Sequence, residues 1–235
     1  MKNKFNLIFL IGTEGSGHHL FKDCCNVEEE YPLHESIFNY FTSSDIKRKN
    51  LLERDIYEYT KKNIGKKHIE RTSFPFGSFN KYNEMYRNPI FYYDILDFYN
   101  LFSSMEHINL FFIVNTRNII ETTISSITRF NEAVIYSAKL QENSLIYINS
   151  QMQLIPRNKY IIVDFNNLRK NIKEFEKIFQ EKSNINISFN IDKIKHIDNT
   201  KYVKNIHYDY LKTHFNKTRL QQFKFLIDNT YIIQN

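Results

Sequence analysis

Three of the five glycines in this 235-residue chain fall within six residues, at Gly12, Gly15 and Gly17. Glycine is used where the backbone must take a positive φ angle or where a ligand approaches it closely. The cluster directly follows a short apolar run at 4–11, which has the length and composition of a buried parallel strand. Apolar residues at helical spacing come after it. The sequence therefore predicts a strand, a tight glycine loop and a helix over 4–30.

A loop between a strand and a helix N-terminus gathers backbone N–H groups and the positive end of the helix dipole at one point. We expect an anionic group, a phosphate above all, to bind there. The expected anion-binding residues are Gly12, Thr13, Glu14, Gly15, Ser16, Gly17, His18 and His19.

The spacing of Gly12 and Gly17 is that of a P-loop. A P-loop that uses ATP continues with Lys, which reaches the phosphates, and with Ser or Thr, which holds Mg²⁺. Here both positions are histidines, His18 and His19. The loop therefore lacks the lysine charge and the metal ligand together, and we expect it to bind a nucleotide without using a metal.

Further strands are expected at 67–72, 108–115 and 159–165, with helices between them. The expected helices are 45–63, 91–105, 119–127, 131–152, 168–181 and 208–228. This alternation predicts an α/β fold of three layers, a parallel sheet with helices on both faces, of the P-loop nucleotide-binding type. One domain over 1–235 is the simplest division. The loops 12–19, 70–77 and 116–129 leave strand carboxyl ends, so we expect them to converge.

At the glycine loop the chain resembles the sulfotransferase family, whose members use 3′-phosphoadenosine 5′-phosphosulfate as the sulfuryl donor. In that family a loop of the form G-x-x-x-S-G-T-T grips the 5′-phosphosulfate. The segment GTEGSGHHL matches this form at Gly12, Ser16 and Gly17 and departs from it at the two histidines. Many members carry Lys or Arg directly before the Ser-Gly pair, where this chain has Gly15. The candidates to replace that charge are His18, His19, Lys22 and Arg71.

A second segment also resembles the family. Arg117 and Asn118 follow the third predicted strand, and Ser125 comes eight residues after Arg117. The family's 3′-phosphate element has an Arg, an Asn or Asp and a Pro, followed by such a Ser; here Ile119 replaces the Pro. An Arg offers a charged fork to a phosphate. The resemblance therefore implies that Arg117 and Ser125 hold the nucleotide's 3′-phosphate.

Sulfuryl transfer to a hydroxyl needs a base to take the hydroxyl proton. Glu70 is the first candidate because it lies near the end of the second predicted strand, a region where the family often has a Glu or a His. His18 is the second catalytic candidate. The further alternatives are His19, Glu14 and Asp94. The segment 73–77 that follows is expected to shape the acceptor pocket.

The net charge is +6, and the basic residues are spread along the chain without forming a basic block. We therefore expect no nucleic-acid partner. Lys201, Lys204 and Lys212 in the tail are expected to form a solvated face; the alternative is that they reach the nucleotide's 3′-phosphate or an acidic acceptor. The adjacent Cys24 and Cys25 are expected to be reduced thiols. No apolar run is long enough for a membrane span or an export signal, so we expect a cytoplasmic location.

The remaining histidines show no metal-ligand spacing, and no metal is expected. The prediction is a sulfotransferase that moves a sulfuryl group from 3′-phosphoadenosine 5′-phosphosulfate to an acceptor hydroxyl on a small molecule or glycan. A carbohydrate is the first candidate for the acceptor. Two alternatives stay open: a P-loop kinase or other phosphotransferase, and a catalytically inactive nucleotide-binding module. The sequence does not indicate an oligomeric state.

Overall fold

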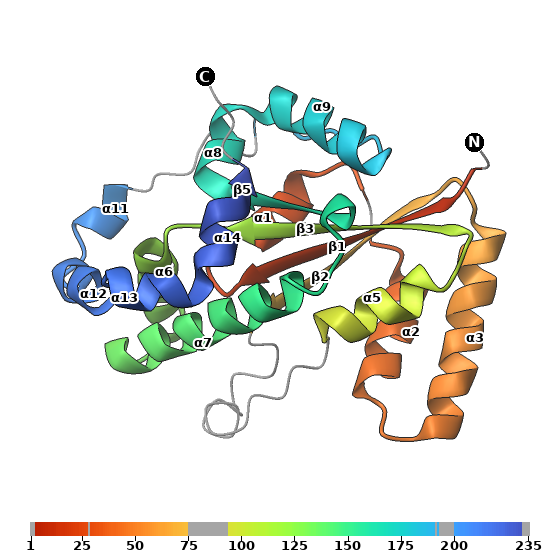
Figure 1. Cartoon of the computed structure of the whole chain (residues 1–235), viewed down its shortest axis with the longest axis horizontal. Helices are drawn as coiled ribbons and strands as arrows, with labels where there is room; N and C mark the ends of the chain where they lie inside the picture. The colour runs from red at the N-terminus through yellow and green to blue at the C-terminus, as the bar shows by residue number, and fades with distance from the viewer. Residues whose placement is uncertain (1–2, 28, 75–93, 191, 193–199, 232–235) are drawn as a thin grey trace.

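In the computed structural model, residues 3–27, 29–74, 94–190, 192 and 200–231 are described. Five parallel strands form one sheet in the order β2-β1-β3-β4-β5. The strands are β1 (Phe5–Thr13), β2 (Lys67–Phe74), β3 (Ile108–Thr116), β4 (Tyr160–Asp164) and β5 (Thr230–Tyr231). Their carboxyl ends point toward the side of the molecule where the C-terminal helices lie (Figure 1).

Helices connect the strands and make up the outer layers. The helices are α1 (His18–Cys24), α2 (Tyr31–Thr42), α3 (Ile46–Lys62), α5 (Ile95–Ser103), α6 (Ile119–Phe130), α7 (Val134–Met152), η2 (Arg157–Lys159), α8 (Phe165–Lys170), α9 (Ile172–Ser183), α11 (Thr200–Val203), α12 (Tyr208–His214), α13 (Lys217–Leu220), η3 (Gln221–Phe223) and α14 (Lys224–Asn229). In the described ranges, none of them combines the length and the apolar composition that a bilayer span requires.

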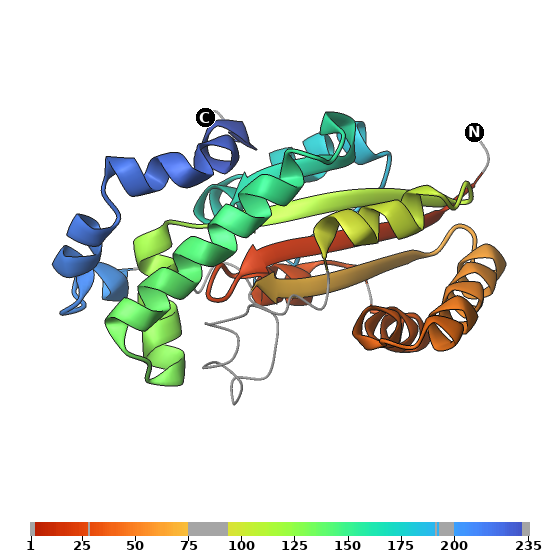
Figure 2. The ribbon, with the colours of Figure 1, turned by 60° about the horizontal axis from the view of Figure 1, so that its bottom comes forward.

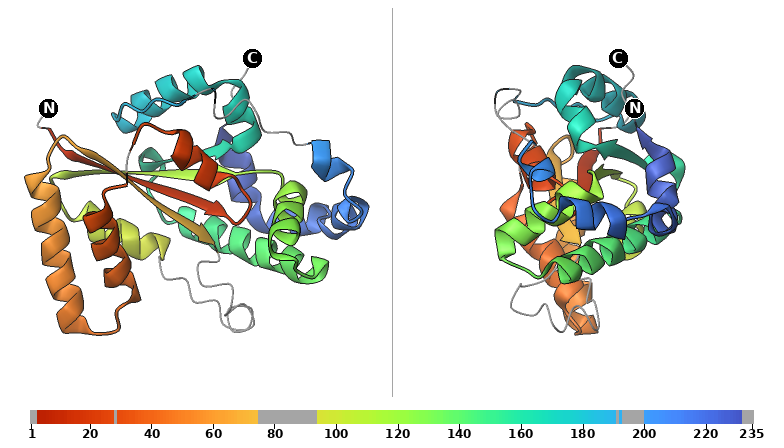
Figure 3. Two further views of the ribbon diagram at one scale, coloured as in Figure 1. Left: turned by 180° about the vertical axis from the view of Figure 1, so that it is seen from behind. Right: turned by 90° about the vertical axis from the view of Figure 1, so that its left-hand side faces the viewer.

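The core lies on both faces of the sheet because the central strands are apolar throughout. Phe9 of β1 belongs to the cluster under α5 and α7, and its ring stacks on Phe98 of α5 with centroids 3.9 Å apart. Its neighbour Leu10 belongs to the opposite cluster, with residues of α1, α8 and α9. Figures 2 and 3 show these two helical layers with the sheet between them. The predicted three-layer α/β architecture is confirmed.

All four predicted strands are present, and each begins and ends within two residues of its expected bounds. The two-residue strand β5 and the helix α2 were not predicted. The prediction of a single helix over 168–181 is wrong. The backbone of Asn171 is not helical (φ −136°), so two helices form there, α8 and α9. The closing helix expected over 208–228 is likewise divided into short helices. Cys24 and Cys25 are free cysteines, as expected.

The order of the strands decides where a ligand can bind. β1 lies between β2 and β3, so the chain leaves β1 in one direction to reach β2 and crosses back to reach β3. In open parallel sheets such a reversal opens a crevice at the strand carboxyl ends. The glycine loop follows β1 at this point, and Arg117 follows β3 beside it.

Candidate functional site

The glycine loop is held tightly between two helices. Gly15 and Gly17 both have positive φ angles, +81° and +90°, which side chains other than glycine's rarely permit. A Cβ atom on Gly15 would lie 2.8 Å from the backbone oxygen of Thr122 in α6. A Cβ atom on Gly17 would lie 2.9 Å from the ring of Phe165 in α8. The loop is therefore closely packed, and its conformation depends on the glycines.

This packing leaves no room for a Lys or Arg directly before Ser16. A Lys or Arg in place of Gly15 would need a left-handed backbone and would push its Cβ into Thr122. Any cation that serves the loop must therefore come from another element. The structure brings two arginines to it, Arg71 from β2 and Arg129 from α6.

His18 is buried inside the loop. Its Nδ1 atom lies 3.1 Å from the hydroxyl of Ser16. Its Nε2 atom has no hydrogen-bond partner in the described part of the chain, which is unusual for a buried nitrogen. Burial, followed by the nearby His19, Arg71 and Arg129, holds the pKa of His18 well below its ordinary value. The imidazole is therefore neutral.

His19 lies beside His18, with ring centroids 4.2 Å apart. A guanidinium N–H of Arg71 donates to Nδ1 of His19. Because Arg has no acceptor, this bond fixes the tautomer of His19 with its proton on Nε2. Burial, Arg71 and Arg129 lower the pKa of His19. The loop thus carries two neutral imidazoles, and two arginines, Arg71 and Arg129, contact it.

Glu14 ties the glycine loop to α6 and α7. Its carboxylate is buried and accepts a 2.7 Å hydrogen bond from Arg129, while its backbone oxygen accepts one from Gln141, also at 2.7 Å. Burial raises the pKa of Glu14, and Arg129 opposes that shift. The side chain of Arg129 is 60% exposed and lines a cavity of about 380 Å³ with Ser125 and Tyr202. Sequence reasoning missed Arg129, whose partner lies 115 residues away.

Arg117 and Ser125 both lie against Gly15. The Nη1 atom of Arg117 donates to the backbone oxygen of Gly15 at 3.3 Å, and its Nε atom donates to Glu121 at 3.0 Å. Its guanidinium stacks on the ring of Tyr202, 4.7 Å from the centroid. The Arg117 side chain is only 5% exposed. Arg117 therefore braces the loop and also lines a cavity of about 400 Å³ with Thr116 and Asp164, and the neighbouring Ser125 lines the cavity of Arg129.

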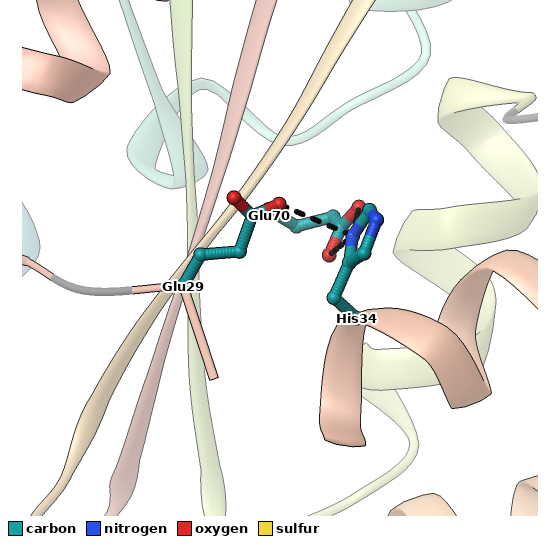
Figure 4. Close-up of side chains that lie close together, drawn as sticks. All are labelled: Glu29, His34 and Glu70. Carbon is teal, nitrogen blue, oxygen red and sulfur yellow. Dashed lines mark hydrogen bonds and ion pairs between the residues drawn. The ribbon is translucent and has the colours of Figure 1, made fainter. Parts of the chain in front are cut away.

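Glu70 lies in the interior, at the centre of β2. Its side chain is 0% exposed and sits between His34 and His68. Figure 4 shows Glu70 beside His34, with Glu29 nearby. Oε1 lies 2.9 Å from Nδ1 of His34, and Oε2 lies 3.1 Å from Nε2 of His68. Nδ1 of His68 accepts the backbone N–H of Glu30 at 2.8 Å, so the proton of His68 is on Nε2 and points to Glu70. Burial raises the pKa of Glu70, but these hydrogen bonds outweigh it and leave the pKa below its ordinary value.

His34 is a residue that sequence reasoning did not single out. It lies in the first turn of α2, and its side chain is 32% exposed. It lines an open cavity of about 800 Å³ with Lys22, Tyr31 and Arg71. The hydrogen bond to Glu70 raises the pKa of His34. Pro32 at the helix start, followed by apolar residues at helical spacing, is the sequence signal that could have found α2.

Glu29, His34 and Glu70 are the described residues that could hold a metal ion, since one atom of each lies within 4.8 Å of the others. Fixed cations already offset this charge. Lys22 Nζ lies 3.4 Å and Arg71 Nε 3.9 Å from Glu29, and the carboxylates converge on one imidazole nitrogen that can carry a proton. The donor set therefore suits a proton better than a divalent metal.

The other predicted residues take different positions. Thr13 ends β1 and is buried. Asp94 caps α5 and accepts the hydroxyl of Tyr147 at 2.7 Å, so its carboxylate is already used there. Lys204 and Lys212 are exposed. The side chain of Lys201 and residues 75–77 of the expected acceptor loop lie outside the described part of the chain. The described residues of the three predicted loops do converge, through Gly15, Arg71 and Arg117.

Comparison with known proteins identifies the fold. No protein-family model matches the sequence, and no curated protein matches it. Among solved structures, the sulfotransferase domain of the olefin synthase of Synechococcus PCC 7002 matches with a TM-score of 0.51 and 10% identity over 100% of this chain and 98% of that one. The sulfotransferase domain from the curacin biosynthetic pathway matches with a TM-score of 0.50 and 9% identity over 99% and 100%. The chain therefore has the P-loop-like fold of sulfotransferase domains.

Proposed function

We propose that this chain is a sulfotransferase that moves a sulfuryl group from 3′-phosphoadenosine 5′-phosphosulfate to a hydroxyl of a polar acceptor. The observation that carries the proposal is the position of the glycine loop. Within a sulfotransferase-type fold, the loop contacts Ser125 and Arg129, which line one cavity, and its His19 contacts Arg71, which lines a second cavity with His34. A donor nucleotide on one side and an acceptor on the other would meet at the loop.

The loop residues would hold the 5′-phosphosulfate. Gly15 and Gly17 hold the loop in its tight turn at the N-terminus of α1, where backbone N–H groups can meet an anion, and the unpartnered Nε2 of His18 leaves one further polar group of the loop for the ligand. The two arginines provide a positive field without a metal. The missing lysine and hydroxyl after Gly17 count against the kinase alternative.

The cavity beside α6 would take the nucleotide's 3′-phosphate. Ser125 offers a hydroxyl there, and Arg129 can keep one N–H on Glu14 while its remaining donors turn to a phosphate. Arg117, with its Nε and Nη1 donors in protein contacts, would act by positioning the loop. In this proposal Arg129 binds the 3′-phosphate, which the sequence analysis expected Arg117 to bind.

We assign the base to His34 and a positioning role to Glu70. The buried Glu70 holds Nδ1 of His34, and it is His34 that lines the cavity. The donor supplies the sulfuryl group, whose bond to the 5′-phosphate breaks as the acceptor oxygen attacks. Nε2 of His34 takes the hydroxyl proton in that step. The bases expected first, Glu70 and His18, are both buried, and the second has a strongly lowered pKa.

The acceptor cavity is polar, which favours a polyhydroxylated acceptor such as a carbohydrate. Lys22, Glu29, His34 and Arg71 line it with charged or hydrogen-bonding groups. Tyr31 at its rim is 70% exposed and offers a ring face on which a sugar can stack. An apolar acceptor would leave these groups without partners.

Transfer from a labelled donor tests the proposal. The purified protein, with magnesium chelated, is incubated with ³⁵S-labelled donor and a panel of mono- and oligosaccharides. We expect labelled product with the wild type, about 10²- to 10⁴-fold less with His34→Asn, and unchanged transfer with the matched control His207→Asn. Equal transfer by His34→Asn would remove the base assignment. Nucleotide binding without transfer to any acceptor would favour the inactive module, and phosphoryl transfer from ATP with Mg²⁺ would favour the kinase.

A further inference from the structure

We propose that the glycine loop binds its anion together with a proton, which His19 takes up at Nδ1 as Arg71 turns from His19 to the anion. The inference rests on the proposed function only for the identity of the anion. It concerns the feature that separates this loop from an ATP-binding P-loop, the pair His18-His19.

The contact between Arg71 and His19 is the first step of the argument. In the structure, a guanidinium N–H of Arg71 donates to the neutral Nδ1 of His19. An anion is a stronger acceptor than a neutral imidazole, because both partners of the new bond are charged. An anion on the loop therefore competes for Arg71. Once Arg71 leaves, Nδ1 of His19 is free to accept a proton.

The charges around His19 decide whether the proton is taken up. Arg71 on β2 and Arg129 on α6 disfavour the imidazolium, whereas Asp23 on α1 and Glu29 before α2 favour it. Burial and the two arginines prevail, and the pKa of His19 is lowered. A doubly charged anion offsets both arginines. The field at His19 then favours the imidazolium, and protonated His19 gains a charged partner.

His18 does not share this role. It is enclosed, and the hydroxyl of Ser16 can donate to its Nδ1, which leaves the proton on the unpartnered Nε2. Burial holds the pKa of His18 well below its ordinary value, so His18 stays neutral. The two histidines thus differ: His18 keeps its charge unchanged, and His19 is the group that takes up the proton.

Calorimetry in several buffers tests the inference. Adenosine 3′,5′-bisphosphate is titrated into the protein at pH 7 in buffers of different ionisation enthalpy, and the slope of the heat against that enthalpy counts protons. Protons from the ligand's own phosphates cancel between protein variants. We expect wild type to take up about one proton more than His19→Asn, and the control His207→Asn to match wild type. We also expect binding to weaken by up to about tenfold per pH unit above neutrality in the wild type alone.

Further variants and ligands separate the outcomes. Arg71→Gln removes the contact on Nδ1, and we expect a smaller uptake because His19 is then already protonated in part. His19→Gln is the second variant if His19→Asn does not fold. Tight bisphosphate binding with no difference between wild type and both His19 variants would overturn the inference and leave the proposed function intact. Binding of inorganic pyrophosphate but not of the nucleotide, with the same proton difference, would support the inference and remove the nucleotide assignment.

Discussion

The Nδ1 atom of His34 lies 2.9 Å from Oε1 of Glu70, although 36 residues separate them in the chain. A carboxylate in the middle of a buried edge strand thereby fixes an imidazole that lines an open cavity. Since the ionised Glu70 accepts at Nδ1, the Nε2 atom of His34 is the one left to exchange a proton. This pair carries the proposed chemistry, and its consequences can be measured.

The first prediction concerns the dependence of transfer on pH. Glu70 raises the pKa of His34, so the neutral base appears only as the pH rises above that pKa, and the rate rises with it. Glu70→Gln keeps the shape but loses the charge, so the pKa of His34 falls. We expect the acidic limb of the rate–pH profile to move to lower pH, with a lower maximal rate. An unchanged limb in Glu70→Gln would contradict the assignment of His34.

The second prediction concerns stability. The folded-state pKa of Glu70 is below its ordinary 4.5, so its contribution is present above pH 4.5 and is lost as the pH falls through the folded value. The folded-state pKa of His34 is above its ordinary 6.5, so its contribution is present below pH 6.5 and is lost as the pH rises through the folded value. His34→Asn should therefore lower the free energy of unfolding most near pH 5.5, by about 2 kcal/mol. Urea unfolding at pH 5.5 and 8.5 measures this, and an equal loss at both would count against the pair.

Much of the fold could be predicted because its signals are local. The apolar runs at 4–11 and 108–115 can only be buried strands in a chain of this composition. The glycine cluster and the spacing of Arg117 and Ser125 likewise lie within short segments. The contacts that complete the site join distant segments. Glu70 meets His34, and Arg129 meets Glu14, through packing that no local pattern records.

The errors at the helices have a related cause. The break at Asn171 occurs in a segment whose apolar spacing continues across it, with no Gly or Pro to mark it. Strand β5 has two residues, which is too short for any periodicity. Glu70 was expected to reach the acceptor because the expected strand ended two residues after it. The real strand continues to Phe74, which leaves Glu70 enclosed.

The third prediction tests the packing of the loop. Gly65→Ala is the matched control, because Gly65 also has a positive φ of +92° but has nothing within 4 Å of the added methyl group. We expect it to cost about 1 kcal/mol from backbone strain alone. Gly15→Ala adds the clash with Thr122 and should cost about 3 kcal/mol or more. Chemical denaturation compares the two variants. Equal losses would mean that the loop is not packed against α6.

The fourth prediction concerns the buried carboxylate of Glu14. Its folded-state pKa is above its ordinary 4.5, so its contribution is greatest below pH 4.5 and falls as the pH rises through the folded value. Arg129→Ala raises that pKa further by removing the cation. We therefore expect a larger loss of stability at pH 8 than at pH 5, about 1–3 kcal/mol at pH 8.

An exposed pair provides the control for this experiment. Lys224 contacts Asp228 on the surface of α14. Lys224→Ala should change the unfolding free energy by less than about 1 kcal/mol. Thermal and urea unfolding of both variants at the two pH values separates a buried charge from a surface pair. A pH-independent loss in Arg129→Ala would show that the Glu14 carboxylate is not the cause.

Titration calorimetry with adenosine 3′,5′-bisphosphate in the presence of EDTA tests the central claim most directly, with ATP and Mg²⁺ titrated in parallel. We predict metal-independent binding of the bisphosphate, weakened at least about tenfold in Ser125→Ala and in Arg129→Ala, and much weaker binding of ATP with or without Mg²⁺. Binding of ATP that requires Mg²⁺, with none of the bisphosphate, would contradict the account and identify the loop as that of a phosphotransferase.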